Sequence, residues 1–367
     1  MKLVIVLGTR PEIIRLSSTI TLCKKLFDTT LIHTGQNYDK NLSEVFFKAF
    51  NIEPPDIYLD CSKETCCSAV GDIITKTYDI FNQIKPNAIL ILGDTNSGLC
   101  AYSAKRLKIP IFHLEAGNRS FDPNVPEEIN RKIIDHLSDI NMCYTEHAKT
   151  NLLTENCKPA YTFVVGSPMK EIFLTIQNKI QYSTILEKYN LVQNDYFVWS
   201  THREDNVDNN INFNYMIECL LKLSEKYNKK IIFGMHPRVA NKIKSLNITD
   251  ENIIITEPFD IIDYYKLLTN CLLVISDSGT ISEESNILGF KSVLLRYSTE
   301  HPEAIDAGSI ILGNINWVDL QISINVALNL DNTHNDILNY HDENFSEKVC
   351  KIIAGYHSIV NKMLWMK

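Results

Sequence analysis

Carboxylates gather in one short stretch of this 367-residue chain, where an apolar run gives way to a predicted helix. The nineteen residues HLEAGNRSFDPNVPEEINR (113–131) hold four carboxylates, two arginines and a histidine. Glu115 follows the apolar run IPIFHL, Glu127 opens the helix, and Asp94 follows a second apolar run, AILILG. Three carboxylates on neighbouring loops repel one another. At least one should therefore have a raised pKa and act as an acid near neutrality.

A structural interpretation of the same residues stays open. Glu127 and Glu128 complement the dipole at a helix N-terminus, and Asp94 suits a turn. The polar residues at 135–139, farther along the same helix, are expected to be structural. Asp94, Glu115 and Glu127 come without a tight histidine spacing, so we predict no metal site.

A second set of residues is suited to phosphate. VISDSGTISEESNILG (274–289) predicts a strand, a turn of small residues and a helix. Ser278, Gly279 and Thr280 would present backbone N–H groups at the helix N-terminus, where the dipole favours an anion. Glu284, in the first turns of that helix, is placed to accept hydrogen bonds from a ribose diol. The alternative is an ordinary helix N-cap at Ser278.

A similar turn lies in VLGTRPEIIRLS (6–17). Pro11 suits the first helical position, Arg10 projects from the turn, and Arg15 lies about one turn farther along. The turn is neither G-x-G-x-x-G nor a Walker A sequence, so neither a dinucleotide nor a triphosphate is indicated. Two phosphate-facing turns fit a nucleoside diphosphate. Arg203 in THRE and His236 in GMHPR would add donors, although each alone is equally compatible with a surface role.

The elements that must position these residues are short apolar runs that alternate with helix-length amphipathic stretches. The runs are KLVIVLG, DTTLIHTG, AILILGD, IPIFHLE, INMCYT and TFVVG, then YFVWST, KIIFGMH, NIIIT, LLVISD and KSVLLR. Continuous apolar runs separated by helices are typical of parallel strands buried on both faces. We therefore predict two Rossmann-like, doubly wound α/β domains, at residues 1–176 and 177–345.

In such sheets ligands bind beyond the carboxyl ends of the strands. The polar residues named above follow apolar runs in both predicted domains. We therefore expect the site in a cleft between the two domains.

Composition and charge exclude several classes of protein. The chain is 45% hydrophobic and 22% charged, with a formal net charge of −8, which argues against sequence-independent nucleic-acid binding. No run approaches the roughly 18 apolar residues of a membrane span. KLVIVLGTRPE is too short for a signal peptide, so we expect a cytoplasmic protein. The ten cysteines include no C-x-x-C pair and are expected to be small buried hydrophobes.

Eight blocks together resemble the non-hydrolysing UDP-N-acetylglucosamine 2-epimerase family. They are GTRPEIIRLS, HTGQNYD, LGDTNS, HLEAGNR, PEEINRKIIDHLSD, THREDN, HPR and SDSGTISEE. The resemblance implies the glycosyltransferase-B architecture of two Rossmann-like domains, usually in a homodimer. It also implies that the final helix, at residues 346–367, returns to the first domain.

The family's chemistry implies a role for the acids. It inverts C2 of a UDP-2-acetamido sugar without a cofactor, by eliminating UDP to a 2-acetamidoglycal and adding it back. Proton transfer to and from C2 is implied for Asp94, Glu115 and Glu127, without a separate acid or base assigned, and catalysis at the diphosphate for His202. The resemblance implies substrate contacts by Arg10, Arg15, His236, Tyr264 near the uracil, Ser278, Gly279, Thr280 and, at the ribose, Glu284.

Three departures from the UDP-N-acetylglucosamine enzymes concern the substrate. Arg15 replaces a lysine, GNRSFDPNVPEE replaces a Gly-Leu-Arg-Thr-Gly-type loop, and SGT replaces SGG. These features look closer to the branch that acts on UDP-2-acetamido-2,6-dideoxy-L-hexoses for polysaccharide synthesis. That branch makes UDP-N-acetyl-L-fucosamine from the L-talo epimer, or interconverts the L-rhamnosamine and L-quinovosamine derivatives. Epimerisation of UDP-N-acetylglucosamine to UDP-N-acetylmannosamine is the alternative.

Three other functions compete with epimerisation. A glycosyltransferase of the same architecture would leave the three carboxylates unexplained. A hydrolysing 2-epimerase would release free sugar. A non-catalytic nucleotide-sugar sensor would not need Asp94, Glu115, Glu127 and His202 together.

Overall fold

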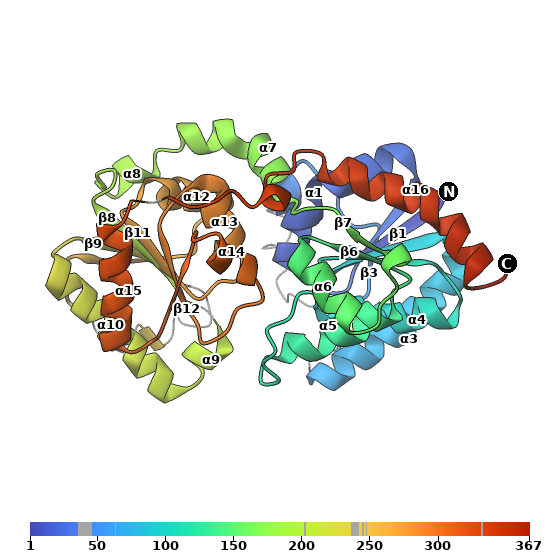
Figure 1. The fold of residues 1–367 in the computed structure, drawn as a ribbon, viewed down its shortest axis with the longest axis horizontal. Coiled ribbons are helices and arrows are strands. Elements are labelled where there is room, and N and C mark those ends of the chain that lie inside the picture. Colours follow the sequence, from blue (N-terminus) through green and yellow to red (C-terminus); the bar gives the residue numbers. More distant parts are fainter. Residues whose placement is uncertain are drawn as a thin grey trace. The chain divides into compact units, whose positions relative to one another are not determined.

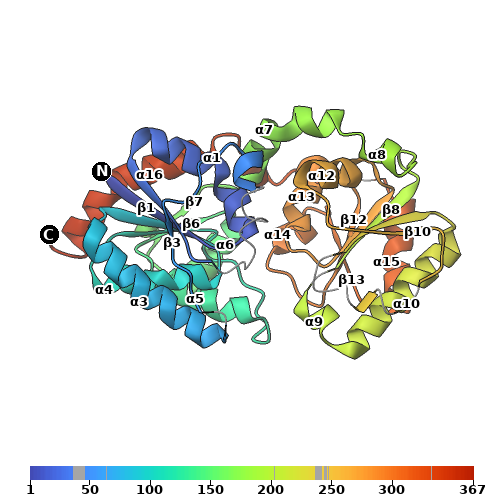
Figure 2. The same ribbon diagram turned by 180° about the vertical axis from the view of Figure 1, so that it is seen from behind.

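The chain folds into two compact units. A computed structural model describes residues 1–35, 46–62, 64–201, 203–235, 242–243, 246, 248–331 and 333–367. The first unit comprises residues 1–172 and 338–367, and the second comprises residues 173–337. The expected boundaries were after residues 176 and 345. Figures 1 and 2 show a sheet with helices on both faces in each unit.

The sheet of the first unit has seven parallel strands in the order β3-β2-β1-β4-β5-β6-β7. Its strands are β1 (Lys2–Leu7), β2 (Asp28–His33), β3 (Ile57–Tyr58), β4 (Ala88–Leu92), β5 (Ile111–Leu114), β6 (Ile140–Cys143) and β7 (Thr162–Val164). Its helices are α1 (Arg10–Leu26), α3 (Cys66–Ile84), α4 (Ala101–Arg106), α5 (Pro126–Leu137), α6 (Glu146–Thr154) and α16 (Phe345–Met363).

The second sheet has six parallel strands in the order β10-β9-β8-β11-β12-β13. They are β8 (Tyr196–Ser200), β9 (Lys230–Gly234), β10 (Ile253–Thr256), β11 (Leu273–Ser276), β12 (Ser292–Leu295) and β13 (Ile311–Gly313). Its helices are α8 (Ile185–Lys188), α9 (Glu204–Val207), α10 (Asn210–Tyr227), α12 (Ile261–Asn270), α13 (Ile281–Leu288), α14 (Pro302–Asp306) and α15 (Trp317–Asn329). The helix α7 (Met169–Tyr182) begins in the first unit and continues into the second.

The predicted fold class, two doubly wound α/β domains, is confirmed, and each of the predicted apolar runs contains a strand. Two strands were not predicted. β3 and β13 have only two and three residues and lie at sheet edges. Such short segments carry too little pattern to be recognised without their neighbours.

The alternation of side chains along β1 shows why its apolar run is continuous. Leu3, Ile5 and Leu7 belong to the core under α1 and α16, whereas Val4 and Val6 belong to the core under α3 and α4. Successive residues of a strand point to opposite faces, so a strand covered on both faces must be apolar at every position.

The C-terminal helix α16 packs on α1 in the first unit (Figure 1). Phe345, Val349 and Ile353 enter the same core as Leu16 and Ile20, and all five are fully buried. No described helix is long and apolar enough to cross a membrane.

Gly117 provides a test of the backbone around the carboxylates. Its φ is +86°, and a Cβ there would lie 2.2 Å from the carbonyl oxygen of Ala148. Because both the dihedral and the space exclude a side chain, we expect Gly117→Ala to lower the free energy of unfolding by about 2–4 kcal/mol in urea titration.

Gly71→Ala is the matched control for this substitution. Gly71 lies in α3 with nothing within 4 Å of its missing Cβ. That substitution should be neutral or stabilising by up to about 1 kcal/mol. Equal stability of the Gly117→Ala variant and the wild type would contradict this account.

Candidate active site

Asp94 and Glu115 leave neighbouring parallel strands at the same sheet edge. β4 pairs with β5, and the Gly93 N–H donates to the Leu114 carbonyl oxygen at 3.0 Å. Glu115 Oε2 lies only 4.0 Å from the position that a Cβ on Gly93 would occupy. Glu115 itself has a φ of +61°, a conformation that non-glycine residues rarely adopt and that often marks functional sites. The structure therefore brings these two predicted acids together.

Two arginines offset the repulsion between these acids. Arg15 Nη1 of α1 lies 3.4 Å from Glu115 Oε2. Arg131 of α5 donates to Asp94 Oδ2 from Nε at 3.1 Å and from Nη2 at 2.5 Å. Both arginines are about 95% buried, so their charges act where water screens little. Arg131 was missed by the sequence analysis, although it closes the quoted nineteen-residue stretch.

The adjacent glutamates of α5 have different environments. Glu128 is buried, and its Oε2 accepts from the Ser120 N–H at 3.1 Å and from Arg131 Nη1 at 2.7 Å. Glu127 is exposed in the first helical turn, four residues before Arg131 and so on the same helix face. The hydrogen bonds make Glu128 structural, whereas Glu127 is exposed, four residues before the arginine that contacts Asp94.

Glu12 is a buried carboxyl that the sequence analysis did not assign. Its Oε2 accepts from the N–H groups of Gly8 and Thr9, at 3.0 and 2.8 Å, and its Oε1 accepts from Thr95 Oγ1 at 3.1 Å. Burial raises the pKa of Glu12 to about 7, although these hydrogen bonds oppose the rise. The Thr9-x-x-Glu12 pattern is a capping-box signal, but it does not reveal that the carboxyl is buried beside Asp94.

Arg10 and Arg15 lie on the first two turns of α1. Arg10 is the first residue of the helix, and burial lowers the pKa of its guanidinium. Arg15 lies over the Tyr144 ring at 5.6 Å, in addition to its contact with Glu115. The β1–α1 turn thus presents cationic groups at the same edge as the carboxylates.

In the second unit, the predicted phosphate turn joins β11 to α13. Ser278, Gly279 and Thr280 form it, and the hydroxyls of Ser278 and Thr280 are 3.0 Å apart. α13 begins at Ile281 with Thr280 as its N-cap, so the N–H groups of the turn lie at a helix N-terminus.

An arginine and a glutamate cover this turn. Arg296 Nη1 donates to Glu300 Oε2 at 2.7 Å, and Arg203 Nη2 lies 3.6 Å from Glu300 Oε1. A Cβ on Gly279 would lie 2.7 Å from Glu300 Oε1, so the Glu300 side chain would have to move to admit one. Arg296 was not predicted, although it directly follows β12, at the position where the strand-end rule would have found it.

Tyr264 and Glu284, predicted at the uracil and the ribose, lie near each other in the second unit. The Tyr264 hydroxyl is hydrogen-bonded to Ser200 at the end of β8, and burial, followed by the Glu284 charge, raises the pKa of Tyr264. Glu284 is 3% exposed, and its Oε1 accepts from the Tyr265 hydroxyl at 3.0 Å. His202 and His236, also predicted site residues, lie outside the described residues.

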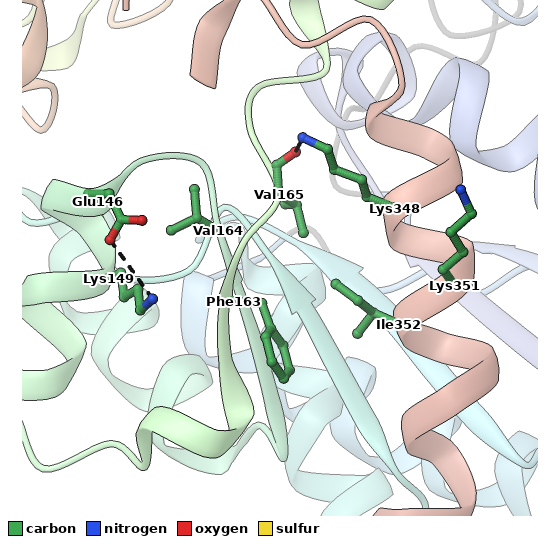
Figure 3. Close-up of a pocket in the computed structure, with 8 residues that line it drawn as sticks. All are labelled: Glu146, Lys149, Phe163, Val164, Val165, Lys348, Lys351 and Ile352. Carbon is green, nitrogen blue, oxygen red and sulfur yellow. Dashed lines mark hydrogen bonds and ion pairs between the residues drawn. The ribbon is translucent and has the colours of Figure 1, made fainter. Parts of the chain in front are cut away.

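A separate pocket of about 430 Å³ lies in the first unit between α6, β7 and α16 (Figure 3). Its charged groups have partners: Lys149 lies 3.9 Å from Glu146, and Lys348 donates to the Val165 carbonyl oxygen at 3.2 Å. None of the predicted site residues lines this pocket, so it is distinct from the carboxylate site.

Comparison with known proteins defines the class. A sequence profile described as UDP-N-acetylglucosamine 2-epimerase matches residues 22–354. A Methanocaldococcus jannaschii protein named UDP-N-acetylglucosamine 2-epimerase is 37% identical over 90% of this chain and 93% of its own length. A Pseudomonas aeruginosa UDP-2,3-diacetamido-2,3-dideoxy-D-glucuronate 2-epimerase is 32% identical over 85% of this chain and 88% of its own.

A solved structure agrees with these relatives. The Methanocaldococcus jannaschii enzyme in complex with UDP-GlcNAc and UDP superposes with a TM-score of 0.90 and 34% identity, over 97% of this chain and all of that one. The architecture is therefore the predicted glycosyltransferase-B type. The fold and these matches define a non-hydrolysing UDP-sugar 2-epimerase. The chain belongs to the UDP-N-acetylglucosamine 2-epimerase family.

Glu12 generates a pH prediction. In the unfolded chain its pKa is about 4.5 and in the folded chain about 7, so between these pH values only the folded state holds the proton. The contribution of Glu12 to stability is therefore full below pH 4.5 and is lost as the pH rises through 7. In Glu12→Gln the free energy of unfolding should no longer fall over this pH range. The expected difference from the wild-type decline is on the order of 3 kcal/mol.

The measurement is urea unfolding of both proteins from pH 4.5 to 8. An exposed substitution, Glu64→Gln, should leave the wild-type slope unchanged. Parallel pH profiles for wild type and Glu12→Gln would show that Glu12 does not hold a proton in the folded state.

Proposed function

We propose that this epimerase inverts C2 of a UDP-2-acetamido-2,6-dideoxy-L-hexose, with Asp94, Glu115 and Glu127 as its proton-transfer groups. The observation that carries the proposal is the Asp94–Glu115 pair at the ends of β4 and β5, each acid facing its own arginine. Inversion without a cofactor needs one group that removes the C2 proton and one that delivers a proton to the opposite face. Two rigidly held carboxylates meet that need.

The proposed reaction is an elimination followed by its reversal. One carboxylate takes the C2 proton, the C1–O bond breaks, and its electron pair leaves with UDP, giving a 2-acetamidoglycal. UDP then adds back to C1 while a second group delivers a proton to the other face of C2. Charge develops on the departing diphosphate, so cationic groups and N–H donors lower the barrier.

From their sequence positions, we assign diphosphate contacts to Arg10, Arg15 and the turn Ser278–Thr280. Arg203 and Arg296 lie beside that turn and join the assignment. His202 and His236 belong to the same assignment from their sequence positions. Tyr264 at the uracil and Glu284 at the ribose complete the proposed substrate contacts. The buried position of Glu284 favours a neutral partner such as a hydroxyl over an anion.

The 6-deoxy-L-hexose substrate is supported by where the chain departs from its family. Arg15, in place of a lysine, contacts Glu115 directly, so the departure lies at the proposed chemistry. The relatives named above differ at C6, a hydroxymethyl group in the glucosamine and a carboxylate in the glucuronate, so substituents at C6 vary among them. UDP-N-acetylglucosamine is the second candidate, favoured by the name of the 37% identical relative.

The proposed setting is a cytoplasmic homodimer that supplies polysaccharide synthesis. An exposed apolar face on α3, α4 and α5 supports the dimer: Tyr78, Tyr102, Ile129 and Ile133 are each between 42% and 59% exposed. These helices are neighbours, and exposed apolar side chains gathered on neighbouring helices suit an interaction surface.

Removing the charge of one proposed acid tests the site. Asp94→Asn, Glu115→Gln and Glu127→Gln should each lower kcat by at least about 100-fold, because each removes a proton-transfer group. UDP affinity, measured by calorimetry, should stay within about threefold. The exposed Glu53→Gln is the control and should retain wild-type kcat. A collapse of UDP affinity together with kcat would make these acids structural.

Relative rates on three substrates test the sugar. Initial rates of C2 inversion are compared by NMR for UDP-N-acetyl-L-rhamnosamine, the UDP-L-talo sugar and UDP-N-acetylglucosamine. We expect kcat/KM for a 6-deoxy-L sugar to exceed that for UDP-N-acetylglucosamine by at least about 100-fold, the discrimination that a pocket of fixed shape supplies. The opposite order would assign the enzyme to UDP-N-acetylglucosamine.

A further inference from the structure

His113 is fully buried beside the peptide that precedes Asp94 and has no role in the assignments above. It lies on β5, two residues before Glu115, and its side chain is 0% exposed. A buried histidine must satisfy two ring nitrogens, so its partners are informative.

The first partner is the peptide that precedes Asp94. His113 Nε2 lies 2.8 Å from the Gly93 carbonyl oxygen. A carbonyl oxygen only accepts hydrogen bonds, so Nε2 carries a proton and donates it. The Gly93 N–H in turn donates to the Leu114 carbonyl oxygen at 3.0 Å. Both backbone polar groups of Gly93 are thus held by β5, which fixes where the chain turns toward Asp94.

The second partner is Asp135 of α5. His113 Nδ1 lies 2.9 Å from Asp135 Oδ1, at ion-pair distance although outside hydrogen-bond geometry. Asp135 also accepts from the Gly117 N–H at 3.2 and 3.3 Å and from Arg119 Nη1 at 2.7 Å. Gly117 is two residues after Glu115, so Asp135 holds the far side of the turn that carries Glu115.

These contacts hold the backbone next to each of the two acids. His113 fixes the peptide before Asp94, and Asp135 fixes the turn after Glu115. We propose that His113 is the positioning residue that, together with Asp135 on the far side of the turn, sets the spacing of Asp94 and Glu115. This inference rests on the proposed function of these two acids.

The chemistry explains why spacing matters. The two carboxylates must address opposite faces of one carbon, so a shift of either changes the distance over which a proton moves. A misplacement of 1 Å can cost about 100-fold in rate.

The test compares three variants of His113 with the wild type. His113→Leu removes the donor, and His113→Asn stays polar but has too short a side chain to reach the Gly93 carbonyl. His113→Gln can place an amide N–H close to the position of Nε2. All three are first checked for folding by circular dichroism and thermal unfolding. His357→Leu, in α16 of the same unit, is the matched control because His357 contacts carbonyl groups of its own helix.

We expect His113→Leu and His113→Asn to lower kcat by about 100-fold, with KM and UDP affinity within about threefold of wild type. His113→Gln should recover at least about tenfold of the lost kcat. His357→Leu should behave as wild type. If His113→Leu does not fold, the comparison of His113→Asn with His113→Gln carries the test.

Two outcomes would overturn the proposal. One is wild-type kcat in folded His113→Leu or His113→Asn. The other is equal loss in the Asn and Gln variants, which would show that the donor to Gly93 is irrelevant. Failure of the proposed function looks different: Asp94→Asn and Glu115→Gln would then retain turnover whatever the His113 variants do.

Discussion

The structure of the first unit depends on keeping two carboxylates close together at one edge of a parallel sheet. Asp94 and Glu115 follow the adjacent strands β4 and β5. Two negative charges held on neighbouring strand ends repel each other, and the repulsion is strong where little water screens it. Arg15 and Arg131 offset this cost, one from α1 and one from α5. The positions of both helices therefore matter for the site as well as for the core. The buried capping carboxyl of Glu12 then ties the β1–α1 turn to Thr95, next to Asp94.

The proposed function places a complementary demand on the second unit, the binding of an anion. Its β11–α13 turn presents N–H groups at a helix N-terminus, and Arg203 and Arg296 lie beside it. In the structure the carboxylate of Glu300 lies against Gly279 and is paired with Arg296. An internal acid thus occupies the place beside the turn where negative charge is favoured. In the proposed function, the first unit carries the proton-transfer groups, and the β11–α13 turn of the second unit contributes to binding the diphosphate.

The two sheets could be predicted from the sequence because continuous apolar runs have few other interpretations. The position of Asp94 and Glu115 at strand ends could be predicted because both follow such runs. The sequence could not show which acids are buried: Glu127 and Glu128 are adjacent and look alike, yet only Glu128 is held by Ser120 and Arg131. A raised pKa was expected among Asp94, Glu115 and Glu127, whereas the carboxyl whose pKa burial raises is Glu12, which accepts a hydrogen bond from Thr95 next to Asp94. The proposed role of His113 could not be predicted from the sequence either. It depends on contacts with Gly93 and Asp135, which lie about twenty residues away along the chain.

The central claim is that the acids of the first unit exchange a proton at C2 of a UDP-2-acetamido sugar. The most direct measurement is proton NMR of the substrate H2 signal during turnover in D2O, with no added cofactor. The account predicts that product formed by the enzyme carries deuterium at C2. It also predicts that Asp94→Asn and Glu115→Gln give neither deuterium nor product. Inversion that retains the original C2 proton would contradict the account, because the proton would then never have left the sugar for an exchangeable carboxyl.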